Sequence, residues 1–585
     1  MHIAEKNIEG RRYYYLQHSH RAKSHTAGRG KVKTSSVYLG TAENILERLN
    51  QTKRPVEVEQ KEFGLIAALL VISKDLGLSQ MLQERFDGER NGLPHWLYFF
   101  LTIINRLHDA TSKNQMANWA GKTILPYLWE FNPKLLTSKN FWYATDAVIS
   151  EAELRTARIA QEVLTEEKLA PLKEANPALF NDLFAGVDDA MFHEIAEELF
   201  ARIKARFGIP EPAVLYDTTN FFTYIDEPST SKLARVGHNK DGKHSLRQVG
   251  LALAVDKAYG VPFYYRIYRG NSHDSKVFAG VIDELVQKIK GQFEGVDNLV
   301  LILDKGNNSK QNFKQLEGKI RWVGSLDQSK YPEFFEKDLS EYDGQYQDIC
   351  FYAVKKKIME MDCLVVSTYR PSLARKQLFT LHAGIAKLTS EIQSKWGTYK
   401  KPQATVPAGI NSMIKASRYG KFIRLHVHDN SYLTYEIVEL ERAIAQKKFG
   451  RNLLFTGDKD ADASWVISNY QSKYKIEESF KLIKSTDLVR FRPIRHFTDT
   501  KIAAFSFCCI IALMLIRAME LLCTEAGMKM SPELIVEELA DIKAVTMVYG
   551  LKDIHTEITK RSKVQQKLWD LFRLQEVADQ LPYKA

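Results

Sequence analysis

Two apolar runs, each ending in an aspartate, constrain this chain more than any other feature. Val214-Leu215-Tyr216 leads into Asp217, and Leu299-Val300-Leu301-Ile302-Leu303 leads into Asp304. Continuous apolar runs of this length are typical of strands that are buried on both faces of a sheet. We therefore predict an α/β fold in which two central strands each deliver a carboxylate at their end.

A third acid, Glu477, lies in a segment whose pattern predicts a helix. Tyr470, Lys473, Glu477 and Lys484 are spaced by three, four and seven positions. At about 100° per residue these steps keep all four on one stripe of a single helix. The apolar residues of the segment lie to one side of that stripe, so the acid borders the packed face. An ordinary solvated helix places its charges away from the core.

The three acids together indicate a metal-dependent site, although each one alone is more often a turn former or a surface residue. Hard cations such as Mg²⁺ prefer oxygen ligands, and two ions can activate an attacking oxygen and stabilise a leaving one. Carboxylates alone repel a phosphate backbone, so a phosphodiester substrate also requires cations beside them. Lys473 and Lys484 have the spacing for that role.

On these residues the chain resembles the DDE transposases of bacterial insertion sequences. The resemblance is to the insertion-sequence-four-like superfamily, which carries a Tyr-x2-Arg-x3-Glu-x6-Lys signature. Lys473 stands here where that signature has arginine, so the charge is kept but the bidentate fork is lost. The remaining matches are Leu215-Tyr216-Asp217-Thr218-Thr219, Leu301-Ile302-Leu303-Asp304-Lys305-Gly306, and residues 237–241 and 270–274.

The resemblance implies a ribonuclease-H-like α/β core interrupted by a strand-rich insertion, with a helical N-terminal DNA-binding region. It implies cut-and-paste transposition, in which terminal inverted repeats are cleaved and a freed 3′-hydroxyl is joined to target DNA. Asp217, Asp304 and Glu477 would be both the catalytic residues and the ligands of two Mg²⁺ or Mn²⁺ ions in each active site. A homodimer on double-stranded DNA is implied as well.

The order of apolar and polar segments predicts six regions. The gap between Asp304 and Glu477 is far longer than a loop requires, so we expect an insertion between them. Within the core we expect three strands, a helix and a fourth strand. Amphipathic helices are expected near 61–85, 94–107, 150–165 and 188–206. The regions are a basic hairpin region 1–57, a helical DNA-binding region 58–208, core parts 209–326 and 461–522, the insertion 327–460, and a helical C-terminal region 523–585.

A formal net charge of +11 favours a polyanionic partner. Basic residues crowd the first 35 positions and interleave with tyrosines, which suits contacts to phosphates and sugars; a disordered basic tail is the alternative. Trp396, between two lysines, is a candidate for stacking on a flipped base. The predicted DNA-contacting residues are Arg11, Arg12, Trp396, Tyr470, Lys473, Lys484, Arg490, Arg492 and Arg495.

Five cysteines without ligand spacing, and a start without an apolar signal segment, predict a reducing compartment. With the resemblance, this is the cytoplasm of a bacterium, in contact with the nucleoid. The most apolar stretch, 503–516, is shorter than the roughly 20 residues of a membrane span, so we expect a buried core helix and no membrane partner.

Two other classes of protein fit the same residues. One is a metal-dependent nuclease that cuts DNA without strand transfer. The other is a catalytically idle DNA-binding protein derived from a transposase. Joining of a cut end to a target plasmid separates these alternatives. His238, His244 and His273 lie in the predicted core; a metal role is one alternative, but without paired ligand spacing structural or DNA-contacting roles are favoured.

Overall fold

In the computed structural model, the chain forms two compact units. A central unit holds residues 72–117 and 134–536, and a terminal unit holds 1–71, 118–133 and 537–585. The six predicted domain boundaries stay predictions. The predicted helix 150–165 and His244 lie outside the described residues. The described residues are 2–21, 32–51, 55, 57–149, 189–209, 213–225, 231–238, 242–243, 245–293, 298–429, 432–549 and 553–581.

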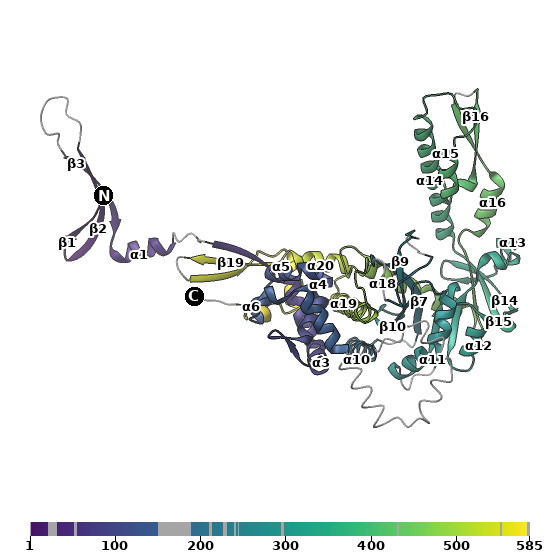
Figure 1. The fold of residues 1–585 in the computed structure, drawn as a ribbon, viewed down its shortest axis with the longest axis horizontal. Coiled ribbons are helices and arrows are strands. Elements are labelled where there is room, and N and C mark those ends of the chain that lie inside the picture. Colours follow the sequence, from purple (N-terminus) through teal and green to yellow (C-terminus); the bar gives the residue numbers. More distant parts are fainter. Residues whose placement is uncertain are drawn as a thin grey trace, which may run out of the picture. The chain divides into compact units, whose positions relative to one another are not determined.

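The central unit is built on one mixed sheet of ten strands (Figure 1). Its first half has the order β10-β9-β7-β11-β12, in which β9 is antiparallel to both neighbours and β11 is parallel to both neighbours. Helix α11 (Asp274–Gln292) connects β10 to β11, which confirms the predicted order of three strands, helix and strand. The bounds are β7 Ala213–Phe222, β9 Arg247–Asp256, β10 Pro262–Arg269, β11 Val300–Leu303 and β12 Arg321–Ser325.

Part of the predicted insertion continues this sheet instead of standing apart from it. Strand β18 (Arg451–Thr456) pairs antiparallel with β12, and β15, β14 and β13 follow in that order. Without β18, strand β12 would leave its backbone donors and acceptors exposed as an edge. The outer strands are β13 Gly344–Tyr346, β14 Ile349–Ile358 and β15 Met361–Tyr369, and the short β8 (Arg235–Val236) pairs with β9.

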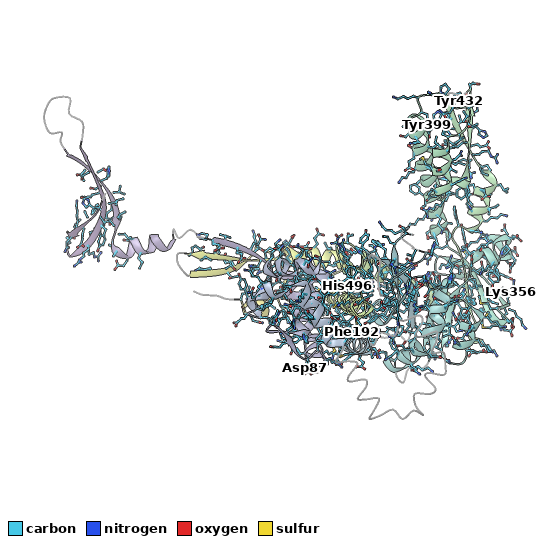
Figure 2. The ribbon with its side chains drawn as sticks, viewed as in Figure 1. Asp87, Phe192, Lys356, Tyr399, Tyr432 and His496 are labelled. Carbon is cyan, nitrogen blue, oxygen red and sulfur yellow. The ribbon has the colours of Figure 1, made fainter. Side chains whose placement is uncertain are left out.

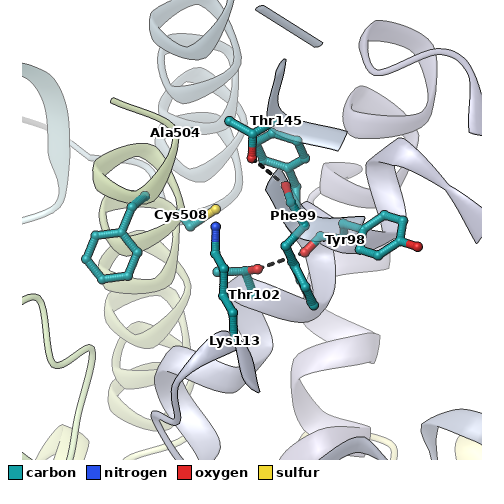
Figure 3. Close-up of a pocket in the computed structure, with 9 residues that line it drawn as sticks. Tyr98, Phe99, Thr102, Lys113, Thr145, Ala504 and Cys508 are labelled. Carbon is teal, nitrogen blue, oxygen red and sulfur yellow. Dashed lines mark hydrogen bonds between the residues drawn. The ribbon is translucent and has the colours of Figure 1, made fainter. Parts of the chain in front are cut away.

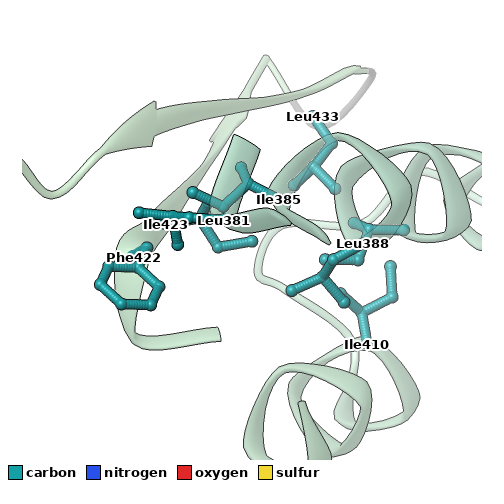
Figure 4. Packing of buried hydrophobic residues seen from close by; sticks show 8 residues of the cluster. Leu381, Ile385, Leu388, Ile410, Phe422, Ile423 and Leu433 are labelled. Atoms are coloured by element: carbon teal, nitrogen blue, oxygen red, sulfur yellow. The ribbon is translucent and has the colours of Figure 1, made fainter. Parts of the chain in front are cut away.

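The chain between β15 and β18, residues 371–450, forms a lobe with its own small core (Figure 4). Helix α14 contributes Leu381, Ile385, Leu388 and Ile392, whose spacing keeps them on one face. Gly384 is required because a Cβ there would lie 2.2 Å from the ring of Tyr419. The lobe contains α14 Pro371–Trp396, α15 Ala408–Ala416, β16 Ile423–His428, β17 Tyr432–Ile437 and α16 Glu439–Lys448.

Helices α3 (Leu78–Arg85), α4 (His95–His108), α10 (Ala190–Phe207) and α19 (Asp499–Glu525) pack together in the central unit. The predicted core helix 503–516 is confirmed within α19, which is long and apolar enough to cross a membrane but has its most apolar part entirely buried. Phe192, labelled in Figure 2, stacks on Phe507 at 4.7 Å between ring centroids. The predicted helix 61–85 breaks at Gly77, whose φ is +67°.

A buried ionic network fixes two helices against the sheet. The Arg266 guanidinium on β10 lies 2.9 Å from Asp189 and 2.7 Å from Glu284 of α11. His193 of α10 lies 3.0 Å from Asp189 as well. Burial opposes ionisation, but His193 and Arg266 lower the pKa of Asp189 to about 2. The network therefore stays charged and ties α10 and α11 to β10.

The terminal unit has two three-stranded sheets. One has the order β1-β2-β3, with Leu16 opposite Val37, which confirms the predicted N-terminal hairpin. The other has the order β20-β19-β4. The predicted all-helical C-terminal region is wrong at β19 and β20, because these strands pair with β4 near the other end of the chain. The bounds are β1 His2–Ile8, β2 Arg11–Arg21, β3 Val32–Gly40, α1 Ala42–Gln51, β4 Glu57–Glu62, β19 Lys543–Tyr549, β20 Asp553–Ile558 and α21 Lys563–Leu571.

Candidate active site

Parallel pairing of β7 and β11 brings the two aspartates together. Leu303 lies opposite Tyr216, so Asp304 follows in register with Asp217. Paired strands are about 4.8 Å apart, and residues in register on parallel strands point to the same face. The prediction that Asp217 ends its strand is wrong, because β7 continues to Phe222 along its pairing with β9. Asp217 lies where β7 passes the end of β11.

The carboxylate of Asp304 is held by three donors. Its Oδ1 accepts hydrogen bonds from the backbone N–H of Lys305 at 2.7 Å and the Ser325 hydroxyl at 3.0 Å. Its Oδ2 lies 2.8 Å from the Lys473 ammonium. Burial alone would raise the pKa of Asp304, but Lys473 holds that pKa below its ordinary value. The carboxylate is therefore ionised and fixed in orientation.

Glu477 reaches the same place from the first turn of α18 (Tyr474–Lys484). Lys473 Nζ lies 3.6 Å from Glu477 Oε1, so one ammonium contacts two of the three acids. The Glu477 side chain is 60% exposed, whereas that of Asp304 is 26% exposed. The two side chains therefore differ in their freedom to move, because Asp304 is anchored and Glu477 is turned toward solvent.

The signature segment is not one helix as predicted. Helix α17 (Ala463–Gln471) ends before α18 begins, and the junction is closed by hydrogen bonds that span three residues. Lys473 N–H, for example, donates to the Tyr470 carbonyl at 3.1 Å. These three-residue hydrogen bonds replace the α-helical ones, so the side chains before and after the junction no longer lie on one stripe of a single helix. Tyr470 still borders the acids, because the Lys473 ammonium that contacts them lies 5.9 Å from the tyrosine ring. Burial of Tyr470 raises its pKa to about 12.

Basic residues follow β7 beyond Asp217. Lys484 lies 5.7 Å from the ring of Phe221, four residues further along the strand. Ile494 pairs with Thr223, which places Arg492 and Arg495 beside the end of β7. At about 3.3 Å per residue, the path from Asp217 to Thr223 is about 20 Å long. This path leads from the acids past Lys484 to Arg492 and Arg495.

Two other predicted residues have more ordinary surroundings. Arg490 donates a hydrogen bond to the Ala110 carbonyl at 3.2 Å. Trp396 is half-buried and packs against the apolar cluster of the lobe. The neighbouring His496 (Figure 2) is buried against Trp142 and Phe505, and burial lowers its pKa far below the ordinary value.

Arg11 and Arg12 lie in the terminal unit on β2, where both are exposed. Arg12 lies 3.5 Å from Glu5 of the neighbouring strand β1. Lys6 lies 4.9 Å from the ring of Tyr15 on the same pair of strands. The described residues 2–21 and 32–35 of this basic and aromatic segment therefore belong to a sheet.

Sequence reasoning missed two polar groups beside the acids. Ser325 ends β12 as Asp304 ends the apolar run of β11, and that shared position was the available signal. Asp274 begins α11, and its Oδ2 would lie 3.2 Å from a Cβ added at Gly306. The Tyr268 hydroxyl lies 3.5 Å from Asp274. Asp274 thus lines the turn after Asp304, although its family-like block 270–274 carried no assigned role.

The donor set suits a hard cation, but the ligands are not gathered around a vacant position. Among the described residues, no three His, Cys, Asp or Glu side chains converge closely enough to hold a metal ion. All three acids offer carboxylate oxygens, the ligands that Mg²⁺ and Mn²⁺ prefer. The Lys473 ammonium already lies between two of these acids.

Neither of two cavities in the central unit contains the acids. One, of about 20 Å³, has room for a single water molecule and lies between Tyr98, Lys113 and Cys508 (Figure 3). The other is a groove of about 710 Å³ that includes Leu299 and Arg321, at the opposite ends of β11 and β12 from Asp304.

Comparison with known proteins gives the class. Residues 225–515 match the family model described as "Transposase DDE domain", a range that contains Asp304 and Glu477 and begins just after Asp217. This part of the chain is therefore similar to a transposase DDE domain. No curated protein matches the chain.

One solved structure is similar over most of the chain. It is described as the cryo-EM structure of the piggyBac transposase synaptic complex with hairpin DNA. The sequences are 9% identical, the match covers 90% of this chain and 88% of that one, and the TM-score is 0.39. A TM-score this low does not establish a shared topology, so the sheet order above stands on its own.

Proposed function

We propose that this chain is a metal-dependent DNA transposase of the cut-and-paste type, with Asp217, Asp304 and Glu477 as its catalytic acids. The observation that carries the proposal is the contact of one ammonium, Lys473, with both Asp304 and Glu477. These acids are far apart in the sequence and come from different elements of the sheet and helix layers. The register of β7 and β11 adds Asp217.

The acids would hold two Mg²⁺ or Mn²⁺ ions, which supply activation of the attacking oxygen and stabilisation of the leaving one. The donors from Lys305 and Ser325 orient Asp304 for that task. Water then attacks the phosphodiester at the element end and releases a 3′-hydroxyl. That hydroxyl attacks either the opposite strand or target DNA, without a covalent protein–DNA bond.

Positive charge along β7 and in the lobe supports DNA as the substrate. Residues 371–450 contain 13 Lys and Arg against 5 Asp and Glu. Four of these acids pair within the lobe: Glu391, Glu436, Glu439 and Glu441. Most of the remaining basic side chains are therefore available to phosphates. Tyr399 and Tyr432 belong to the same lobe (Figure 2).

Within this proposal, the basic sheet with Arg11 and Arg12 and the N-terminal helices bind the terminal inverted repeats. The lobe and the path along β7 contact DNA near the cut. Two chains form a dimer that pairs two element ends. The compartment is the cytoplasm of a bacterium, at the nucleoid.

Replacing Lys395, Lys400 and Lys401 with glutamine is expected to weaken duplex binding in a salt-dependent manner. Each lost phosphate contact reduces the slope of log affinity against log salt concentration by about 0.9, so a loss of about 2 to 3 is expected. Fluorescence anisotropy over a salt series measures it. The matched control replaces Lys314, Lys355 and Lys357, which are exposed outside the lobe. Equal slopes for the two variants would remove the lobe from the DNA interface.

The proposed function is tested by an assay for covalent joining of a DNA end to target DNA. Duplexes taken from the DNA that flanks the reading frame are incubated with the protein, Mg²⁺ and a supercoiled target plasmid. A transposase produces plasmid covalently joined to the duplex end. Cleavage without joining would identify a nuclease, and binding without cleavage would identify an idle derivative.

A further inference from the structure

Lys473 occupies an unusual position for a residue expected to contact phosphate. Its ammonium lies 2.8 Å from Asp304 Oδ2 and 3.6 Å from Glu477 Oε1, and its side chain is only 20% exposed. The lysine is therefore a cation in contact with two acids.

The two carboxylate oxygens of Asp304 have different partners, and the Lys473 ammonium contacts only one of them. Oδ1 of Asp304 is taken by the Lys305 N–H and the Ser325 hydroxyl. Oδ2 is the oxygen that faces Glu477 across the ammonium. A divalent ion that bridges these two oxygens would repel the ammonium, so the ion and the lysine compete for them.

We propose that Lys473 is an internal counter-ion that holds Asp304 and Glu477 together in the DNA-free protein and yields its place to a metal ion when DNA arrives. A DNA phosphate draws the ammonium away, so metal binding is coupled to DNA binding. This inference rests on the proposed metal site.

Lysine is suited to this exchange of partners. Its ammonium is a point charge on a flexible stem, whereas the planar guanidinium of arginine favours one bidentate geometry. The Glu477 side chain is 60% exposed, so it can move with a cation that it contacts. The departure from the signature at position 473 thus gains a physical role. Lys473 acts on the metal site through position and charge and is a positioning residue.

The test measures Mn²⁺ binding by the full chain, with free Mn²⁺ followed by electron paramagnetic resonance. Wild type without DNA is expected to bind Mn²⁺ weakly, and an uncleavable duplex end is expected to strengthen binding. Lys473→Gln is expected to bind Mn²⁺ without DNA at least about fivefold more tightly than wild type, the factor that two unit charges about 4 Å apart give even in bulk water. DNA should strengthen its affinity less than it strengthens that of wild type.

Two variants control for charge and for folding. Lys481→Gln removes the same charge from an exposed position of α18, where the side chain is 79% exposed, and should bind Mn²⁺ as wild type does. Lys473→Arg keeps the charge and should retain weak binding without DNA. Lys473→Met, which also removes the charge, repeats the comparison if Lys473→Gln does not fold.

The outcomes separate the inference from the proposed function. Equal Mn²⁺ affinity of wild type and Lys473→Gln without DNA, or a wild-type affinity that DNA does not change, would overturn the counter-ion role alone. Absence of Mn²⁺ binding in every protein, with and without DNA, would overturn the metal site and the proposed function with it.

Discussion

Replacement of Asp304 by asparagine is expected to lower DNA cleavage by at least about two orders of magnitude, the usual loss when a group that stabilises transition-state charge is removed. Asparagine keeps an oxygen that accepts from the Lys305 N–H and the Ser325 hydroxyl, so the turn is preserved. Duplex binding should stay within about twofold, because contacts to other phosphates carry the affinity.

Nicking and gel-shift assays on one protein preparation measure both properties. The matched control is Asp338→Asn, an exposed aspartate that caps the short helix Leu339–Glu341 and accepts backbone hydrogen bonds in the same way. This control should nick at the wild-type rate. Undiminished nicking by Asp304→Asn would remove Asp304 from the active site.

The largest stability effect is expected at Arg266. Replacement by methionine leaves Asp189 and Glu284 without their shared cation, and loss of one partner from a buried ionic network costs about 3–5 kcal/mol. The control is Lys288→Met on α11, whose ion pair with Glu197 is more exposed and should cost less than about 1 kcal/mol. Urea unfolding measures both values, and similar losses for the two variants would refute the role of the network.

The same network predicts how stability falls in acid. The pKa of Asp189 is lowered to about 2, and Arg266 lowers the pKa of Glu284 against the effect of burial. A carboxylate with a depressed folded-state pKa stabilises the protein above its ordinary pKa near 4, and that stability is lost as the pH falls toward 2. Wild type should therefore lose stability over this range, and Arg266→Met should lose less. Parallel acid curves for the two proteins would contradict this assignment.

The strands around Asp217 and Asp304 could be predicted because their apolar runs are continuous, which reflects burial on both faces of the sheet. Helix α19 was equally clear from its apolar length. The return of β18 to pair with β12 could not be predicted, since that pairing joins segments separated by the whole lobe. Nor does any Gly or Pro mark the break between α17 and α18.

The sequence singled out the residues of the candidate site, but it could not predict all of their contacts. Helical periodicity correctly made Lys473 a neighbour of Glu477. It could not show that the ammonium reaches Asp304 on another element, because periodicity orders residues within one helix only. Ser325 and Asp274 were missed for the same reason, since their importance comes from the turn after Asp304 and not from their own segments.

The central claim is that Asp217, Asp304 and Glu477 form one metal site acting on DNA. Anomalous diffraction from Mn²⁺ in crystals of the full chain with an uncleavable duplex end tests it most directly. The account predicts two Mn²⁺ ions about 3.5–4 Å apart, the separation of two-metal sites, contacted by all three carboxylates, with Lys473 moved away from Asp304. Mn²⁺ bound elsewhere, or a Glu477 side chain turned away from ions held by the two aspartates, would contradict it.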